Sequence, residues 1–156
     1  MNAESSFTLH LEQLDGYEFK VRFDKPALLD MVVDEGPPLG AQRGPSPARL
    51  LAASVAHCLS ASLLFCTTKA KVPPRRITAI AVTDMARDEH GRLRVGALHI
   101  TLDVESAGGE EARFLHCVDL FEEFCVVTAS VRRGVPITVT VTANGEPLPP
   151  PHDEEP

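Results

Sequence analysis

Four cysteines are the residues of this sequence best suited to covalent chemistry. Cys58 and Cys66 are eight residues apart, and so are Cys117 and Cys125. Eight residues of helix rise about 12 Å, whereas the Cα atoms of a disulfide lie within about 7 Å of each other. Neither pair can therefore bond internally if its segment is a continuous helix. Any disulfide must link the two halves of the chain, and the sequence alone leaves several such pairings open.

Metal binding is a second chemistry that these residues suggest. His57 precedes Cys58 and His116 precedes Cys117, and Zn²⁺ favours such ligands. Adjacent residues on a helix point about 100° apart, however, and the sequence has no Cys-x-x-Cys or His-x-x-x-His pair. It also has no Gly-rich phosphate loop after a strand and no Gly-x-Ser-x-Gly motif. We therefore predict neither a metal site nor a cofactor.

A long helix is predicted to position the first two cysteines. Ser46 suits the N-cap and Pro47 the first helical position, where a missing N–H is not needed. The helix is expected to end near Lys69 or Lys71, before Pro73-Pro74. Between its ends it is apolar on nearly every side, which is typical of a helix that is buried all round.

Period-two alternation of apolar and polar residues predicts strands before and after this helix. Turns are expected at Asp15-Gly16 and at the stretch from Asp88 to Gly91. The predicted elements are strands at 7–11, 17–23 and 28–33, the long helix, strands at 77–87 and 93–105, a helix from 110 to about 124, a short helix at 126–133 and a strand at 135–141. Antiparallel hairpins segregated from helices indicate an α+β fold, with a single domain over residues 1–143 and a disordered Pro-rich, acidic tail at 144–156.

Charge and composition exclude several classes of function. The chain has 156 residues, a net charge of −7 and a pI near 5.3, which argues against nucleic-acid binding. Its longest apolar stretch is interrupted by serines and His57, so no membrane span is predicted. The first residues lack the pattern of a secretory signal. We therefore predict a cytoplasmic protein whose cysteines rest as thiols.

The region around the long helix contains a set of short motifs. They are Gly-Pro-Ser-Pro at 44–47, Leu-Leu-Ala-Ala at 50–53, Cys58 eleven residues after the second Pro, the loop at 34–40, and Cys125 before a short helix and a final strand. On these residues the chain resembles the OsmC/Ohr superfamily. The resemblance extends over roughly residues 6–143. It implies antiparallel sheets wrapped around long central helices in an intertwined homodimer.

The resemblance also implies a chemistry, in which Cys58 pairs with Cys125. Cys58 would attack a hydroperoxide and become a sulfenic acid, and Cys125 would condense with it to a disulfide. A dithiol, of the lipoyl type or another, would then reduce the disulfide. The expected substrate is an organic hydroperoxide, because the surroundings of the helix are apolar. Cys66 and Cys117 lack support from the motif and are predicted to be core residues.

The chain departs from the family pattern at one position, and for this reason we also consider an alternative function. Peroxidases of this family have a Glu directly after the Pro of the helix start, paired with an Arg, and this chain has Ala48 there. The Arg that supports a Cys58 thiolate would be Arg22 or Arg43. The predicted ligand-binding residues around the thiol are Leu51, Val55, His57, Leu59 and Phe124. The alternative is a weakly active or non-catalytic protein of the same fold that binds a small molecule or senses redox state.

Overall fold

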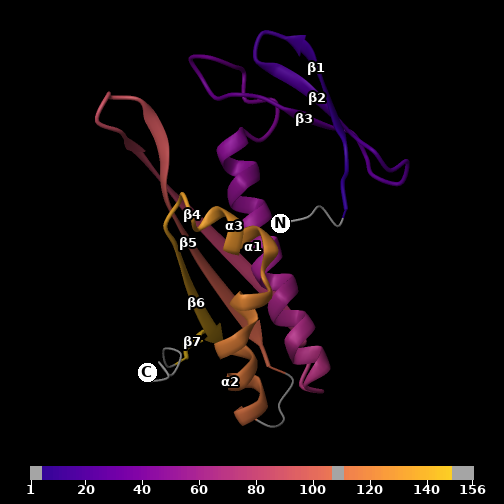
Figure 1. Ribbon diagram of the computed structural model, residues 1–156, viewed down its shortest axis with the longest axis vertical. Helices are drawn as coiled ribbons and strands as arrows, with labels where there is room; N and C mark the ends of the chain where they lie inside the picture. The colour runs from indigo at the N-terminus through magenta and orange to yellow at the C-terminus, as the bar shows by residue number, and fades with distance from the viewer. Residues whose placement is uncertain (1–4, 107–110, 149–156) are drawn as a thin grey trace. The chain divides into compact units, whose positions relative to one another are not determined.

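The computed structural model describes residues 5–106 and 111–148, which divide into two compact units with the boundary in the chain between Leu50 and Leu51. Figure 1 shows the elements in chain order. They are β1 (Leu9–Asp15), β2 (Glu18–Phe23), β3 (Met31–Val33), α1 (Pro47–Lys69), β4 (Arg76–Arg87), β5 (Leu93–Glu105), α2 (Glu111–Leu120), the 3-10 helix η1 (Phe121–Phe124), α3 (Val126–Val131), β6 (Ile137–Ala143) and β7 (Glu146–Pro147). The mixture of sheets and helices confirms the predicted α+β class.

The first unit is a three-stranded antiparallel sheet in the order β1-β2-β3. Its first hairpin turns at Gly16, whose φ of 52° lies in the left-handed region that favours glycine. Val21 and Val33 are its buried apolar residues. The hairpin is the predicted one, and β3 is shorter than the strand expected at 28–33.

The loop that leads into α1 is organised by Asp34, which is nearly fully buried. Its carboxylate accepts hydrogen bonds from three backbone N–H groups, those of Glu35, Ala41 and Arg43, at 2.8, 3.0 and 3.0 Å. The bond from the Arg43 N–H is the main reason that the pKa of Asp34 lies below its usual value. Gly44 passes so close to the Val32 carbonyl that a side chain there would overlap it. This loop leads into Ser46 and Pro47, and α1 begins at Pro47 as predicted.

The second unit contains a four-stranded mixed sheet in the order β4-β5-β6-β7. β4 pairs with β5 and β6 with β7 in antiparallel fashion, as predicted for hairpins, but β5 and β6 run parallel. The parallel pair arises because the connection between them passes through α2, η1 and α3, and a helical crossover returns the chain in the same direction.

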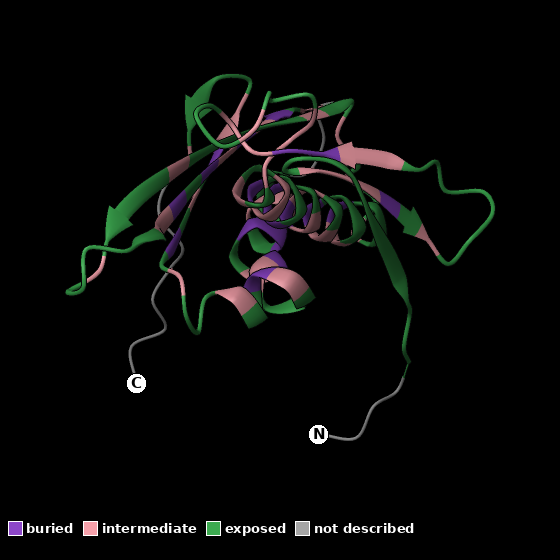
Figure 2. Cartoon of the chain, turned by 90° about the horizontal axis from the view of Figure 1, so that it is seen from above, coloured by how far each residue is buried: buried purple, intermediate pink, exposed green. Residues whose placement is uncertain are grey.

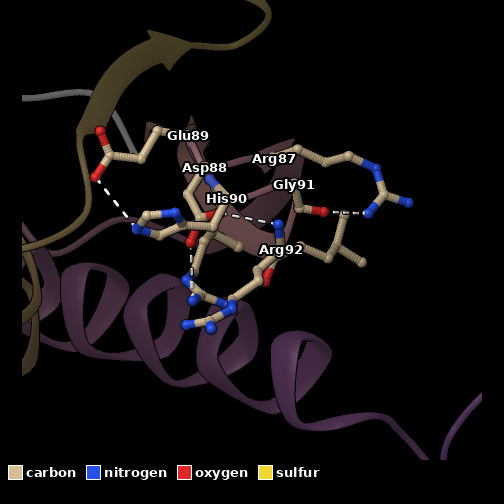
Figure 3. Close-up of polar contacts among 8 residues, drawn as sticks. Arg87, Asp88, Glu89, His90, Gly91 and Arg92 are labelled. Carbon is tan, nitrogen blue, oxygen red and sulfur yellow. Dashed lines mark hydrogen bonds and ion pairs between the residues drawn. The ribbon is translucent and has the colours of Figure 1, made fainter.

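The β4–β5 hairpin is closed by a network of polar contacts at its turn (Figure 3). The Asp88 carboxylate accepts the backbone N–H groups of His90 and Arg92 at 3.0 and 2.9 Å. Arg87 donates to the carbonyl of Gly91 at 2.6 Å, and Gly91 adopts a φ of 74°. These contacts fix the register of the longest strand pair, at the turn that the sequence predicts.

The helices of the second unit lie on one face of its sheet (Figure 1). The core between them combines α1 residues with one side of β5 and with Val118 and Phe121 of the α2–η1 segment. The β5 residues on that side are Leu98, Ile100, Leu102 and Val104. On the opposite face, the His99 ring contacts Thr138 Oγ1 at 2.6 Å and Asp84 Oδ2 at 2.8 Å, all at exposed positions.

Helix α1 is not buried all round within this chain (Figure 2). Leu59 and Leu63 are fully buried, whereas Leu64 and Phe65 are 46% and 56% exposed. By length and composition alone α1 could cross a membrane, with a mean hydropathy of 1.8 over its apolar window. Its contacts with the sheet show that it is also the core helix of this unit.

Two segments near the end of the chain differ from the sequence-based prediction. Helix α3 ends at Val131 instead of Arg133. Strand β7 and the turn at Asn144-Gly145 lie inside the tail predicted to be disordered, where Thr142 and Ala143 pair with Pro147 and Glu146. Residues 149–156 of that predicted tail, and Gly108-Gly109, lie outside the described residues. The prediction of one domain over 1–143 stays a prediction.

Candidate redox site

In the structure the Cys58 and Cys125 side chains lie close enough for Cys58 to raise the pKa of the Cys125 thiol. Cys58 lies near the middle of α1 and is half-buried, and Cys125 lies between η1 and α3 and is fully buried. Both are free thiols. The two cysteines that the resemblance pairs therefore lie near each other in the structure.

The Cys125 thiol is held in its protonated form by its surroundings. Burial is the main reason that its pKa is raised, and the hydrogen bond to Cys58 raises it further. Thr128 opposes this, because its hydroxyl, with Oγ1 2.8 Å from the Cys125 sulfur, and its backbone N–H favour the thiolate. The Cys125 thiol donates its hydrogen bond to Thr128 Oγ1.

The two sulfurs differ in their access to solvent, and therefore in the reactions open to each of them. Cys58 has the greater access to solvent, so a reagent from solution reaches it first. Cys125 is shielded and adjacent, which is the position from which a second thiol can displace a leaving group on Cys58. The disulfide between these two residues that the resemblance implies stays a prediction.

A cavity of about 350 Å³ opens beside α1. Its lining includes His57, together with Arg75 and Arg76. The other lining residues are Ser60, Ala61, Leu64, Pro74 and Ile77. One of the predicted ligand-binding residues, His57, thus lines this cavity, and Cys58, which follows it in the chain, does not.

The other predicted ligand-binding residues have different surroundings. Val55 and Leu59 are fully buried in the core between α1 and the sheet, and Leu51 packs against that core. Phe124 is 60% exposed. Val55 and Leu59 therefore support the helix that carries Cys58 by packing.

The two predicted arginines both belong to the first unit. Arg22 is exposed and pairs with Glu12 at 2.9 Å and with Asp30 at 3.6 Å. Arg43 is exposed and pairs with Glu18 at 3.2 Å. Their roles beside Cys58 stay predictions. The first turn of α1 holds no acidic residue, in keeping with Ala48 at the position where the resemblance leads one to expect Glu.

Cys66 and Cys117, which were predicted to be core residues, also lie near each other in the structure, because Cys66 raises the pKa of Cys117. Cys66 is half-buried on α1 and Cys117 is fully buried on α2. The spacing of eight residues between the two cysteines of each half is the same in both halves, and this was the signal in the sequence that could have indicated a second pair.

A pH dependence follows from Cys117. Burial and then the hydrogen bond to Cys66 raise its pKa from 9.0 to about 12. Between these values the folded protein keeps a proton that the unfolded chain releases, so the free energy of unfolding falls as pH rises. One such group contributes a slope of up to about 1.4 kcal/mol per pH unit. Cys117→Ala should flatten the slope in urea unfolding under reducing conditions from about pH 8 to about pH 10.5.

A matched control for this experiment is Val118→Ala, which truncates the buried neighbour of Cys117 and removes no titratable group. It should lower stability equally at every pH. An unchanged slope in Cys117→Ala would contradict the assignment of the buried proton to Cys117.

Comparison with known proteins agrees with this architecture. Residues 40–140 match the family described as OsmC-like protein. The chain belongs to the OsmC-like protein family. No curated protein sequence matches it.

Within the described residues no group of three or more His, Cys, Asp or Glu side chains could hold a metal ion.

Solved structures with the OsmC-like fold cover most of this chain. An OsmC-like protein from Mycoplasma pneumoniae has a TM-score of 0.76 at 12% identity, over 90% of this chain and 99% of its own. An organic hydroperoxide resistance protein from Elizabethkingia anophelis has a TM-score of 0.70 at 19% identity, covering 91% and 100%. The organic hydroperoxide resistance protein OhrB of Bacillus subtilis has a TM-score of 0.62 at 19% identity, covering 90% and 100%. These likenesses confirm the predicted OsmC-like fold.

Proposed function

We propose that this OsmC-like protein reduces organic hydroperoxides with the Cys58/Cys125 pair, as a thiol-dependent peroxidase in oxidative-stress defence. The observation that carries the proposal is that the half-buried Cys58 lies near enough to the buried Cys125 to raise the pKa of its thiol. The family and the names of the Elizabethkingia and Bacillus proteins support a redox role of this class.

The reaction begins at the more accessible sulfur. The Cys58 thiolate attacks the O–O bond of the hydroperoxide, takes the distal oxygen as a sulfenic acid and releases the alcohol, which gains a proton. The Cys125 sulfur then attacks the sulfenic sulfur, and the Cys125 proton leaves with the hydroxyl as water. An external dithiol, of the lipoyl type or another, restores both thiols by exchange. No metal and no cofactor takes part in these steps.

The burial of Cys125 determines which of the two sulfurs reacts first with the peroxide. Because its pKa is raised, Cys125 stays protonated near neutral pH and does not compete for the peroxide. Its reactivity is directed to the neighbouring Cys58 sulfur instead. The Thr128 hydroxyl, which favours the Cys125 thiolate, can offset part of the cost of ionising Cys125 during the second step.

The preference for organic peroxides is proposed from the apolar character of α1 around the thiol. The cavity beside α1, which His57 lines, combines Ala61, Leu64 and Ile77 with two arginines. It offers apolar contact to an organic substituent and positive charge to any carboxylate that the peroxide carries.

Steady-state consumption of cumene hydroperoxide with dihydrolipoamide as reductant tests this proposal. We expect turnover that saturates in both substrates and exceeds turnover with hydrogen peroxide. Consumption no faster than in buffer with dithiol alone would contradict the peroxidase.

A weakly active redox sensor is the second candidate, favoured by Ala48, which leaves the first turn of α1 without a carboxylate. A sensor oxidises once per event and needs no rapid reduction. This second candidate therefore predicts that, in the same assay, each protein molecule forms one Cys58–Cys125 disulfide and that no further peroxide is consumed.

Replacing the second cysteine separates the two steps of the reaction. In Cys125→Ser, Cys58 should still oxidise, but its sulfenic acid has no thiol to displace water and persists. Trapping with a 1,3-dione reagent and mass spectrometry should label Cys58 strongly in Cys125→Ser and weakly in wild type. Cys117→Ser, which removes a buried thiol outside the pair, should label like wild type. Equal labelling in wild type and Cys125→Ser would exclude Cys125 as the resolving residue.

We also propose that the protein works as a cytoplasmic homodimer. Leu64 and Phe65 on α1 are exposed in the single chain, and so are Ile80 and Val82 on β4. A second copy would cover such apolar surface. Sedimentation velocity should give the mass of a dimer, and a monomer at micromolar concentration would contradict this.

A further inference from the structure

The cavity beside α1 is lined by residues other than the two thiols of the proposed reaction. Helix α1 contributes lining residues at positions 57–64, and the segment that leads into β4 contributes those at 74–77, all within the second unit. Neither Cys58 nor Cys125 belongs to this lining. A ligand can therefore occupy the cavity without a reaction at either thiol.

One part of the cavity wall is apolar and aliphatic. It consists of Ala61, Leu64, Pro74 and Ile77. Leu64 is 46% exposed, so a ligand that covers it would remove apolar surface from water, which favours binding. Among the described lining residues there is no Phe, Tyr or Trp, the side chains that stack on planar rings. This wall therefore suits an aliphatic chain.

The other part of the wall is positively charged. Arg75 and Arg76 are exposed, and neither forms an ion pair with a residue that the structure describes, although Glu105 lies opposite Arg76 in the strand pair. No described acidic residue lines the cavity, and the sequence has no Asp or Glu between Glu35 and Asp84. In a chain with a net charge of −7, the cavity is thus a local site that favours an anion.

The polar groups around the cavity favour a carboxylate over a phosphate. Its α1 residues lie in the interior of Pro47–Lys69, where the backbone N–H groups bond within the helix. The Ser60 hydroxyl donates to the carbonyl of Ala56 at 2.8 Å, and the Arg75 N–H donates to the carbonyl of Glu105 at 2.8 Å. These groups cannot form the cluster of free N–H donors that is typical of phosphate sites. The guanidinium groups remain, and their geometry fits the two oxygens of a carboxylate.

The volume of the cavity limits the length of the chain. A water molecule takes about 30 Å³ in the liquid. The cavity volume of about 350 Å³ therefore corresponds to about a dozen groups of this size. Octanoate, which has eight carbons and a head of two oxygens, is close to that size.

We propose that this cavity is a binding site for medium-chain aliphatic carboxylates such as octanoate. The chain would lie against Ala61, Leu64 and Ile77, and the carboxylate would pair with Arg75 and Arg76. The proposal goes beyond the peroxidase, because the ligand carries no peroxide and no bond is made or broken.

Isothermal titration calorimetry with octanoate tests the proposal in Cys58→Ser/Cys125→Ser, which lacks both thiols of the proposed reaction. We expect one octanoate per chain. Octan-1-ol, which has the same chain without the charge, should bind about threefold more weakly. Butanoate, which is four methylene groups shorter, should bind at least about tenfold more weakly. Wild type under reducing conditions serves if circular dichroism shows that the double variant does not fold.

Variants of the two arginines test the charged part of the wall. Arg75→Gln and Arg76→Gln should each weaken octanoate binding by about threefold, and together by about tenfold, with octan-1-ol binding unchanged. Arg133→Gln removes an exposed arginine outside the cavity and should leave octanoate binding unchanged.

A carboxylate introduced into the cavity tests the location of the site. Ala61 is an exposed residue of α1, and Glu is a good helix former, so Ala61→Glu should keep the fold. Its side chain would pair with the arginines and repel octanoate, which should weaken binding by at least about tenfold. Thr68→Glu adds the same charge at an exposed position of α1 outside the cavity and should leave octanoate binding unchanged.

Three outcomes would overturn the proposal. They are equal affinities for octanoate and octan-1-ol, unchanged octanoate binding in Ala61→Glu, and no binding of millimolar octanoate to the folded protein by calorimetry or by ligand-observed NMR. None of these measurements uses a hydroperoxide or requires a thiol at position 58. Failure here would therefore leave the proposed function of Cys58 and Cys125 unaffected.

Discussion

Cys58→Ser is expected to lower the consumption of organic hydroperoxide by a factor on the order of 100 or more, because removing a nucleophile leaves only substrate binding. Serine keeps the size and polarity of the side chain but does not provide a sulfur that attacks the O–O bond. The structure predicts that neither Cys125 nor Cys117 substitutes for it, because both are buried. The measurement is the initial rate with cumene hydroperoxide and a dithiol in excess.

Cys66→Ser is the matched control for Cys58→Ser. It removes the other half-buried thiol of the same helix, two turns away, and should keep a rate close to wild type. Equal loss in both variants would indicate a general effect on α1. Retention of activity in Cys58→Ser would remove Cys58 from the mechanism.

Phe121→Ala is expected to destabilise the protein by about 3–5 kcal/mol, the usual cost of truncating a buried phenylalanine. Phe121 is 1% exposed and packs in the core between α1 and the sheet, four residues before Cys125. The cavity left by the ring would also loosen η1, the segment that delivers Cys125 to Cys58. Urea unfolding measured by circular dichroism gives the free energy, under reducing conditions that keep the thiols free.

Phe124→Ala provides the internal comparison for Phe121→Ala. It makes the same substitution in the same 3-10 helix, at a position that is 60% exposed. Its effect should stay within about 0.5 kcal/mol. Similar losses in the two variants would contradict the placement of Phe121 in the core and Phe124 on the surface.

Local signals in the sequence were sufficient to predict most elements of the fold. Ser46 and Pro47 mark the start of α1, and the Asp15-Gly16 and Asp88–Gly91 turns mark two hairpins. The parallel pairing of β5 with β6 has no such signal, because it joins residues about forty positions apart across a helical crossover. Strand pairing at that range depends on the tertiary arrangement.

The end of the chain shows how composition can conceal a turn. The proline and acidic content after residue 144 indicated disorder, yet Asn144 and Gly145 adopt φ values of 51° and 82° and close a short hairpin. Asn-Gly is a strong turn pair because both residues tolerate positive φ. The local backbone preference outweighed the average composition at this point.

The candidate site was predictable in part. The pairing of Cys58 with Cys125 came from the family resemblance, since the spacing of the cysteines excluded only pairs within one helix. The nearness of Cys66 to Cys117 was not predicted, although the cysteines have the same spacing in each half, because it depends on how α1 and α2 align. Val55 and Leu59 were predicted to contact a ligand but face the core. When a helix is apolar on every side, its sequence does not show which side packs against the sheet.

The most direct test of the central claim is a titration of the reduced protein with one equivalent of cumene hydroperoxide, followed by peptide mapping of its thiols. The structure predicts rapid loss of two hydrogens, with the new disulfide joining the peptides of Cys58 and Cys125. Cys58→Ser should abolish this loss. A protein that stays fully reduced, or whose first oxidation maps to Cys66 and Cys117, would contradict the account of Cys58 as the attacking thiol.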